Sequence, residues 1–318
     1  MQQEIQVSVI CNTYNHEKYI RDALNGFVMQ KTDFAFEVLI HDDASTDHTA
    51  DIIREYEQKY PELIKPIYET KNQYSKHDGT IKRLQAARVQ GRFVAMCEGD
   101  DYWIDPLKLQ KQYDFMTSYS EYTLCGCSTK WMNELKGKET GKSRTKQDKD
   151  ISLQEFLMPK NGRPFPYVSF FMRKEIWTGV PKWGFPVGDL PLSYYAAMQG
   201  KVRMLADTMC VYRWNTDGSW TARNTDTSMR IETCEKMIRA YEYMNEDTDY
   251  RYSDLISKAI LHQKYFRALM MHDFRAIQSE ELIGLYKNRT LYYRISDRLC
   301  CTMPALIHVI QRITRKNR

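Results

Sequence analysis

The first 120 residues alternate between short apolar runs and longer segments whose apolar residues recur at helical spacing. A β-branched run at 7–11 is followed by a helical pattern at 20–28, and further apolar runs lie at 36–40, 64–68 and 93–97. Strands that alternate with helices predict a parallel sheet with helices on both faces, connected by right-handed crossovers. This pattern constrains the fold more than any other feature of the sequence.

Polar residues gather directly after three of these predicted strands, in the segments 12–16, 42–47 and 98–101. Ligands of such sheets bind beyond the carboxyl ends of the strands. The three clusters are therefore expected to share one edge of the sheet and a single site. Ser45 and Thr46 are predicted caps of the second helix, and Asp105-Pro106 is the predicted start of a later one.

The remaining chain predicts a second half of the same domain and then a helical region. Strands are expected at 122–131, 167–173 and 202–214, with a mobile loop at 133–150 where apolar periodicity is lost. From Thr227 onward the pattern is helical. We expect a catalytic domain at 1–225, with halves at about 1–120 and 121–225, and a helical C-terminal region at 226–318.

The composition is that of a soluble globular protein, with 42% hydrophobic and 27% charged residues. The net charge of +5 is too mild for a dedicated nucleic-acid binder, but phosphate-bearing small molecules and anionic membranes remain open as partners. The eight cysteines show no zinc-type spacing, so reduced thiols are expected. With no signal peptide or membrane span in the pattern, we expect a cytoplasmic protein.

Three carboxylates, Glu98, Asp100 and Asp101, follow the strand predicted at 93–97, and Gly99 between them permits a tight backbone. Carboxylate oxygens are the ligands preferred by Mg²⁺ and Mn²⁺, which stabilise the charge that develops on a leaving diphosphate. The alternative interpretation is a solvated acidic turn.

The segments Val7–Asn15, Glu37–Asp47 and Phe93–Trp103 resemble the family 2 glycosyltransferases, which have the GT-A fold. The likeness is strong over residues 5–118 and weaker over 165–220. It implies a Rossmann-like mixed sheet flanked by helices, and inverting transfer of a sugar from a nucleotide donor, most simply a UDP-sugar. The acceptor would be a hydroxyl of a glycan or lipid-linked glycan, as in cell-surface polysaccharide synthesis.

The resemblance implies that Thr13, Tyr14 and Asn15 border the nucleotide, with Tyr14 available for stacking on the base. Asp43 is expected to accept a hydrogen bond from uracil or a similar base, while Asp42 is expected to be structural. Packing in the loop is the alternative for Tyr14. Helix capping is the alternative for the two aspartates.

The resemblance also assigns Asp100 and Asp101 to the donor and the divalent cation, with Asp101 as the direct ligand. Glu98 stands where many members have Asp, which leaves direct or water-mediated contact open. Asp189 resembles the position of the catalytic base; alternatively it is a helix N-terminal carboxylate favoured by the macrodipole.

Further along, Arg213 is expected to contact phosphate oxygens. Asn215 stands where many relatives have His, which puts a third protein ligand for the cation in doubt. Trp103, Trp214 and Trp220 are candidate sugar or acceptor contacts, with buried packing as the alternative for Trp214 and Trp220.

The tail 286–318 combines aliphatic and basic residues at helical spacing. It predicts either peripheral contact with an anionic membrane surface or a helix packed on the protein with a charged outer face.

Two other functions compete with glycosyl transfer. A dinucleotide-dependent oxidoreductase lacks its glycine fingerprint, since Cys11–Tyr14 stands there instead. A catalytically inactive nucleotide-sugar or glycan binder of the same fold remains open.

Overall fold

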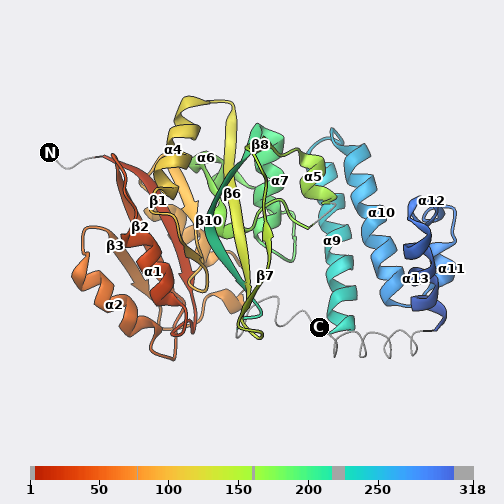
Figure 1. Ribbon diagram of the computed structural model, residues 1–318, viewed down its shortest axis with the longest axis horizontal. Coiled ribbons are helices and arrows are strands. Elements are labelled where there is room, and N and C mark those ends of the chain that lie inside the picture. Colours follow the sequence, from red (N-terminus) through yellow and green to blue (C-terminus); the bar gives the residue numbers. More distant parts are fainter. Residues whose placement is uncertain (1–3, 77, 160–161, 217–225, 304–318) are drawn as a thin grey trace. The chain divides into compact units, whose positions relative to one another are not determined.

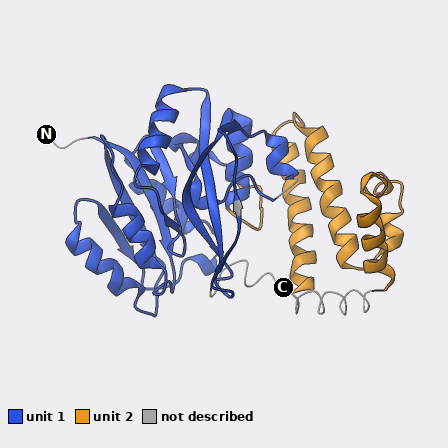
Figure 2. Cartoon of the chain, in the orientation of Figure 1, with its two compact units in different colours: residues 1–181, 189–222 blue, residues 182–188, 223–318 orange. Residues whose placement is uncertain are grey.

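The computed structural model describes residues 4–76, 78–159, 162–216 and 226–303. The chain separates into two compact units (Figure 2): unit 1 comprises residues 1–181 and 189–222, and unit 2 comprises 182–188 and 223–318. We describe each unit by itself. Within the described ranges, no helix combines the length and the apolar character needed to cross a bilayer.

Unit 1 is built on a ten-stranded mixed sheet with the strand order β3-β2-β1-β4-β9-β6-β10-β5, in which β7 pairs with β6 and β8 with β10 (Figure 1). The strands are β1 (Ile5–Thr13), β2 (Ala35–Asp42), β3 (Ile64–Tyr68), β4 (Phe93–Met96), β5 (Tyr102–Trp103), β6 (Tyr122–Asn133), β7 (Lys138–Ser143), β8 (Lys149–Asp150), β9 (Phe171–Arg173) and β10 (Lys201–Trp214). The first four strands pair in parallel, as predicted. Strand β9 is antiparallel to both β4 and β6, so the predicted mixed sheet is confirmed.

Helices connect these strands, and all of them except α3 bury apolar side chains. They are α1 (Ile20–Val28), α2 (Thr49–Lys59), α3 (Thr80–Arg88), α4 (Lys108–Ser118), α5 (Leu153–Leu157), α6 (Lys174–Gly179) and α7 (Asp189–Gln199), with 3₁₀ turns η1 (Tyr74–Lys76) and η2 (Tyr167–Ser169). Val7 and Val9 of β1 point to one face, because strand side chains alternate, and join Ile20 and Leu24 of α1 in the main core. The helical spacing in the sequence therefore marks the surface that covers β1.

Two local expectations from the sequence are wrong, and a third differs by two residues. The predicted loop at 133–150 contains β7 and β8, whose sequences hold no apolar residue and so leave no periodicity to detect. Helix α4 begins at Lys108 rather than Pro106, but the Asp105 carboxylate accepts the N–H of Leu107 at 2.8 Å, as expected of a cap. The N-cap of α2 is His48, preceded by Asp47, rather than Ser45 or Thr46.

Unit 2 is helical in its described part. Its helices are α9 (Thr227–Asp247), α10 (Ser253–Met270), α11 (Phe274–Ile277), α12 (Ile283–Asn288) and α13 (Leu291–Thr302). The segment 182–188 belongs to this unit through Trp183, whose Nε1 donates to Asp247 at 2.9 Å. In α13 the buried Asp297 accepts the hydroxyl hydrogen of Tyr265 at 2.6 Å, which ties α13 to α10.

Gly91 is the position in unit 1 where a methyl group is expected to cost most stability. An added Cβ would lie 2.6 Å from the Ser8 nitrogen and 2.7 Å from the Val7 carbonyl carbon, both backbone atoms of β1. Because strand β1 cannot yield without disturbing its neighbours, we expect Gly91→Ala to lower the free energy of unfolding by about 1–3 kcal/mol. Chemical denaturation measures the change.

Gly141 of β7 provides the matched control, since an added Cβ there meets no described atom within 4 Å. Gly141→Ala should change the free energy of unfolding by less than about 0.5 kcal/mol. Equal effects of the two substitutions would contradict the packing described for β1.

Candidate active site

The loops after β1 and β2 are joined by the side chain of Asn15. This residue has a left-handed backbone with φ of 55°, which Asn tolerates better than most residues. Its N–H donates to Ser45 Oγ at 2.9 Å, and its Oδ1 accepts the N–H of Thr46 at 2.8 Å. Next to it, the side chain of Tyr14 is 45% exposed and that of Thr13 is buried. Asn15 thus fixes the loop that presents the Tyr14 ring.

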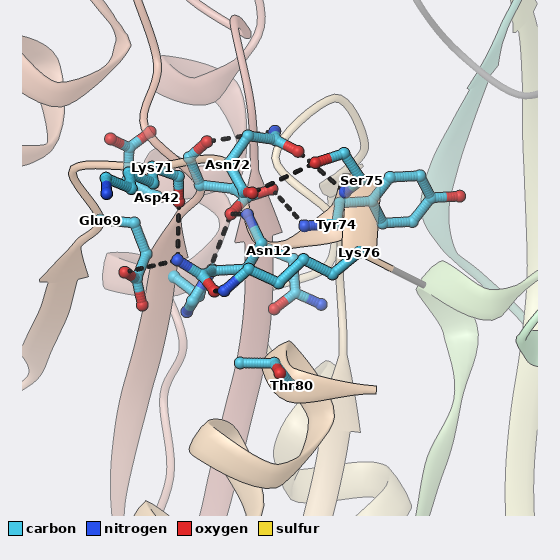
Figure 3. A network of polar contacts seen from close by, with 12 residues as sticks. Asn12, Asp42, Glu69, Lys71, Asn72, Tyr74, Ser75, Lys76 and Thr80 are labelled. Atoms are coloured by element: carbon cyan, nitrogen blue, oxygen red, sulfur yellow. Dashed lines mark hydrogen bonds and ion pairs between the residues drawn. The ribbon is translucent and has the colours of Figure 1, made fainter. Parts of the chain in front are cut away.

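Asp42 and Asp43 are both buried, and each carboxylate accepts hydrogen bonds from backbone N–H groups. The pKa of Asp42 is raised by burial, and Ser45 opposes this rise by donating from its hydroxyl and its N–H. Asp43 accepts the N–H of Gln73 at 2.6 Å and that of Tyr74 at 3.0 Å, which anchors the segment after β3. Figure 3 shows this segment, with Asn72 and Tyr74 labelled in it. A carboxylate has about four acceptor positions, so Asp43 keeps capacity for a further donor.

The predicted carboxylate cluster lies in the turn after β4, beside the end of β1. Gly99 N–H donates to Asn12 O at 3.0 Å, and Asn12 Nδ2 donates to Glu98 at 3.4 Å. A Cβ on Gly99 would lie 2.6 Å from Thr13 Oγ1 and 2.9 Å from His16 Nδ1. Only glycine therefore lets the turn approach β1 this closely, and the clusters at 12–16 and 98–101 meet as predicted.

Arg213, in β10, fixes the same turn from the other side. Its N–H donates to Asp101 Oδ1 at 2.7 Å, and its Nη1 donates to the Asp100 carbonyl oxygen at 3.0 Å. Its guanidinium also pairs with Asp22 and, through Nε at 3.0 Å, with Glu134. Because the guanidinium is committed to these partners, the structure favours a role in holding the turn over the predicted contact with phosphate.

Burial and mutual repulsion disfavour ionisation of the carboxylates. Burial, followed by the charge of Asp100, raises the pKa of Glu98 to about 8. The same two causes raise the pKa of Asp101 well above its usual range, against the opposing hydrogen bond from the Arg213 N–H. A bound cation would relieve both effects by favouring the ionised forms.

The fit of this cluster to a divalent cation rests on the chemistry of its donor set. Hard cations prefer oxygen ligands, and Mg²⁺ is commonly held by one or two carboxylates together with substrate phosphates. Among the described residues, no group of three or more His, Cys, Asp or Glu side chains is arranged to hold a metal ion. Asp100 and Asp101 would therefore hold a cation only together with further oxygen ligands, such as phosphate oxygens.

Asp189 begins α7, and its surroundings connect it electrostatically with the cluster. The charge of Asp189 contributes to the raised pKa of Glu98. Burial is the largest cause of the raised pKa of Tyr212, and the charges of Asp101, Asp100 and Asp189 add to it. Asp189 Oδ2 pairs with Arg163 Nη1. Its Oδ1 is buried and has no hydrogen-bond partner among the described residues. The structure therefore brings the predicted base to the same site as the predicted donor carboxylates.

The three candidate tryptophans have different surroundings. Trp103 is 2% exposed, packs edge-on against Phe27, and donates from Nε1 to Val168 O at 3.0 Å. Trp103 belongs to the core, and its burial contradicts the expected sugar contact. Trp214 is partly buried and donates from Nε1 to Thr140 Oγ1 at 2.9 Å. Trp220 lies outside the described residues.

The sequence profile of the family described as glycosyl transferase family 2 matches residues 8–177. The chain belongs to this family. The family membership and the GT-A fold inferred from the three motifs are thus confirmed.

A relative from Mycobacterium bovis, an uncharacterized protein, is 37% identical over 229 residues, which cover 71% of this chain and 64% of the relative. The poly(ribitol-phosphate) beta-N-acetylglucosaminyltransferase TarS of Staphylococcus aureus is 37% identical over 101 residues, 31% of this chain and 17% of that protein.

Two solved structures share the fold. TarS residues 1–349 in complex with UDP-GlcNAc match with a TM-score of 0.56 and 17% identity, over 93% of this chain and 89% of that one. The mannosyltransferase PcManGT of Pyrobaculum calidifontis, in complex with GDP-Man and Mn²⁺, matches with a TM-score of 0.55 and 15% identity, over 96% and 90%. At these identities the likeness shows the fold alone.

Several residues of the site carried no signal in the sequence. Arg163 and Tyr167 precede β9, and Tyr212 lies in β10, yet all three lie within electrostatic range of Asp189. Thr216 donates to Asp100 Oδ2 at 2.8 Å, and Asp22 reaches Arg213 from α1. Such contacts join positions far apart in the chain, so local patterns could not identify them.

Glu98 is expected to destabilise the protein when no cation is bound. A carboxyl whose pKa rises from 4.5 to about 8 holds its proton longer in the folded state, so stability falls as the pH rises between these values. Glu98→Gln should therefore raise the melting temperature of the cation-free protein, and more at pH 8 than at pH 5. Each kcal/mol corresponds to about 2–4 °C in a domain of this size.

Thermal melts at both pH values, with and without Mn²⁺, measure this effect. Addition of Mn²⁺ should stabilise the wild type more than Glu98→Gln at pH 8. A lower melting temperature for the variant at pH 8 without cation would contradict the described repulsion.

Proposed function

We propose that this chain is an inverting glycosyltransferase that moves a sugar from a nucleotide donor, most simply a UDP-sugar, to a hydroxyl of a glycan or lipid-linked glycan. The observation that carries the proposal is the position of Asp189. A carboxylate with one unpartnered buried oxygen lies within electrostatic range of a carboxylate cluster suited to a diphosphate and a cation. The proposed reaction requires a general base and a site that stabilises the leaving group, and Asp189 and the carboxylate cluster are the candidates for these two parts.

The relatives support the substrate classes. TarS bears a name that describes transfer of N-acetylglucosamine to a polymer, and its structure holds UDP-GlcNAc. PcManGT holds a guanosine donor and Mn²⁺, so GDP-sugars are the competing donors. This chain spans 64% of its mycobacterial relative, and the activity we propose is that of the described domain. We infer a role in synthesis of a cell-surface polysaccharide.

In the proposed donor site, the exposed ring of Tyr14 stacks on the base and Asp43 accepts a hydrogen bond from it. Asp43 has capacity for this bond in addition to its two backbone partners. Thr13 Oγ1 is buried without a hydrogen-bond partner among the described residues and is a further candidate contact. Asn15 acts by holding this loop to Ser45 and Thr46.

In the proposed cation site, Asp101 and Asp100 are the ligands, and Glu98 contacts the ion directly or through water. Arg213 keeps the two aspartates in place through its N–H and its guanidinium. When bound, Mn²⁺ or Mg²⁺ supplies positive charge that stabilises the leaving diphosphate. Trp214, held by Thr140, remains a candidate contact for a sugar.

The proposed reaction uses Asp189 as a general base. Its free oxygen takes the proton from the acceptor hydroxyl while the hydroxyl oxygen forms a bond to the anomeric carbon of the donor sugar. The bond between that carbon and the diphosphate oxygen breaks on the opposite side, which inverts the configuration. The electron pair of the broken bond leaves with the nucleoside diphosphate.

Substitution of Asp189 separates transfer from binding. We expect Asp189→Asn to lower the turnover number about 10²–10⁴-fold, because the amide cannot take the proton. The dissociation constant for UDP in the presence of Mn²⁺, measured by isothermal titration, should change less than about threefold. Turnover is measured as UDP or GDP release across a panel of nucleotide sugars with a glycan acceptor.

Asp150→Asn is the matched control. Asp150 is also an aspartate of unit 1 that pairs with an arginine, Arg203, at 2.9 Å, but it lies in β8 and contacts none of the site residues. It should leave turnover unchanged. If Asp189→Asn keeps full turnover, the base assignment fails. If the wild type binds UDP but turns over no donor in the panel, the chain is instead a binder of the same fold.

We also propose peripheral contact between α13 and an anionic membrane surface. The side chains of Leu291, Tyr292 and Ile295 are 64%, 75% and 52% exposed, and Arg298 is exposed on the same helix. Aromatic and aliphatic side chains beside basic ones are typical of helices that lie at the lipid interface. The remainder of the predicted tail, residues 304–318, lies outside the described residues.

Vesicles that contain anionic lipid test this contact. The double variant Leu291→Ser with Tyr292→Ser should reduce co-sedimentation with these vesicles several-fold, and the reduction should be small with neutral vesicles. Tyr250→Ser is the control, since Tyr250 is 61% exposed in the same unit but lies outside α13. Equal binding by all three proteins would contradict the proposal.

A further inference from the structure

The two oxygens of the Asp189 carboxylate have different surroundings. Oδ2 pairs with Arg163 Nη1, whereas Oδ1 is buried and has no partner among the described residues. A buried acceptor without a partner is unfavourable, and in folded proteins such atoms commonly serve a ligand or a reaction. Since the pair fixes the carboxylate through one oxygen, the other oxygen has a defined direction.

Arg163 reaches Asp189 from a distant part of the chain. It lies in the segment before η2, 26 residues from Asp189, and its side chain is 35% exposed while that of Asp189 is 15% exposed. A partly buried charge pair is held more firmly than one at the open surface, where screening leaves little net attraction. The pair therefore joins the segment before η2 to the first residue of α7.

The other titratable groups around Asp189 leave Arg163 as its cationic partner among the described residues. Glu98 and the hydroxyls of Tyr167 and Tyr212 lie within electrostatic range of Asp189. Arg163 in turn lies near the neutral hydroxyls of Tyr194 and Tyr212; burial opposes the protonated form of Arg163, and the charge of Asp189 favours it, so that its pKa is raised. These neighbours are acidic or neutral, so removal of Arg163 would leave the carboxylate without a nearby positive charge.

We propose that Arg163 is a positioning residue for transfer: it holds Asp189 Oδ2 so that Oδ1 faces the acceptor hydroxyl. The inference rests on the proposed role of Asp189 as the base. Arg163 itself touches no reacting atom in this role. Misplacement of a base by about 1 Å costs about a hundredfold in rate, so loss of the pair should lower turnover strongly.

A positioning role predicts that the loss is confined to kcat. Arg163 touches no atom of the donor in this role, so KM for the donor should stay unchanged while kcat falls. Lysine keeps a cation that can pair with Asp189 Oδ2, so Arg163→Lys should restore part of kcat, an effect that a purely structural role of Arg163 would not produce.

The experiment compares Arg163→Met, Arg163→Lys and Arg203→Met with the wild type. Arg163→Met should lower kcat about 10–100-fold, and leave KM for the donor and the dissociation constant for UDP with Mn²⁺ within about twofold. Arg163→Lys keeps a charge but loses the planar fork, so it should restore part of kcat. Arg203→Met removes the pair with Asp150 and should match the wild type.

The outcomes separate this inference from the proposed function. If Asp189→Asn is inactive but Arg163→Met keeps its kcat, Arg163 does not position the base. If Arg163→Met loses kcat and Arg163→Lys recovers none of it, the pair is structural and the inference is wrong. Retained turnover in Asp189→Asn would instead overturn the role of Asp189 itself. Unchanged UDP binding shows in each case that the variant is folded.

Discussion

The buried guanidinium of Arg213 holds the parts of the carboxylate site together. It pairs with Asp22 from α1 and Glu134 after β6, while the Arg213 N–H and Nη1 hold the turn that contains Asp100 and Asp101. The ring of Tyr102 lies 4.3 Å from it. Buried ion pairs often add little net stability, because desolvation offsets their attraction. The value of Arg213 lies in the single arrangement that its contacts impose on the turn.

That arrangement has an electrostatic consequence for the site. The protein concentrates Glu98, Asp100 and Asp101 in one buried turn, where burial and mutual repulsion disfavour their ionised forms. Arg213 compensates this charge only in part, because its guanidinium is shared with Asp22 and Glu134. The remaining negative charge is of the kind that a divalent cation would offset.

The mixed sheet provides the second half of the site. Strands β1, β2 and β4 are parallel and bring the polar turns after them to one edge, as in other open α/β sheets. Strand β9 reverses direction between β4 and β6, and β10 returns parallel to β6. This second half contributes Arg213, Tyr212 and, through α7, Asp189. The carboxylate turn and Arg213, which holds it, therefore come from parts of the chain that are about 100 residues apart.

Short segments of the sequence were enough to predict the alternation of strands and helices, the polar turns after β1, β2 and β4, and membership in the family. Position after a strand placed Asp43, Glu98, Asp100 and Asp101 in these turns, but their expected roles came from the resemblance to the family and stay predictions. Only the tertiary structure decided that Trp103 packs in the core against Phe27, that Arg213 is committed to carboxylates, and that Arg163 pairs with Asp189. It also decided that residues 138–143 form a strand, since an exposed edge strand needs hydrogen bonds to its neighbour and no apolar pattern of its own. Burial and partner choice depend on contacts between distant residues, and no local pattern contains them.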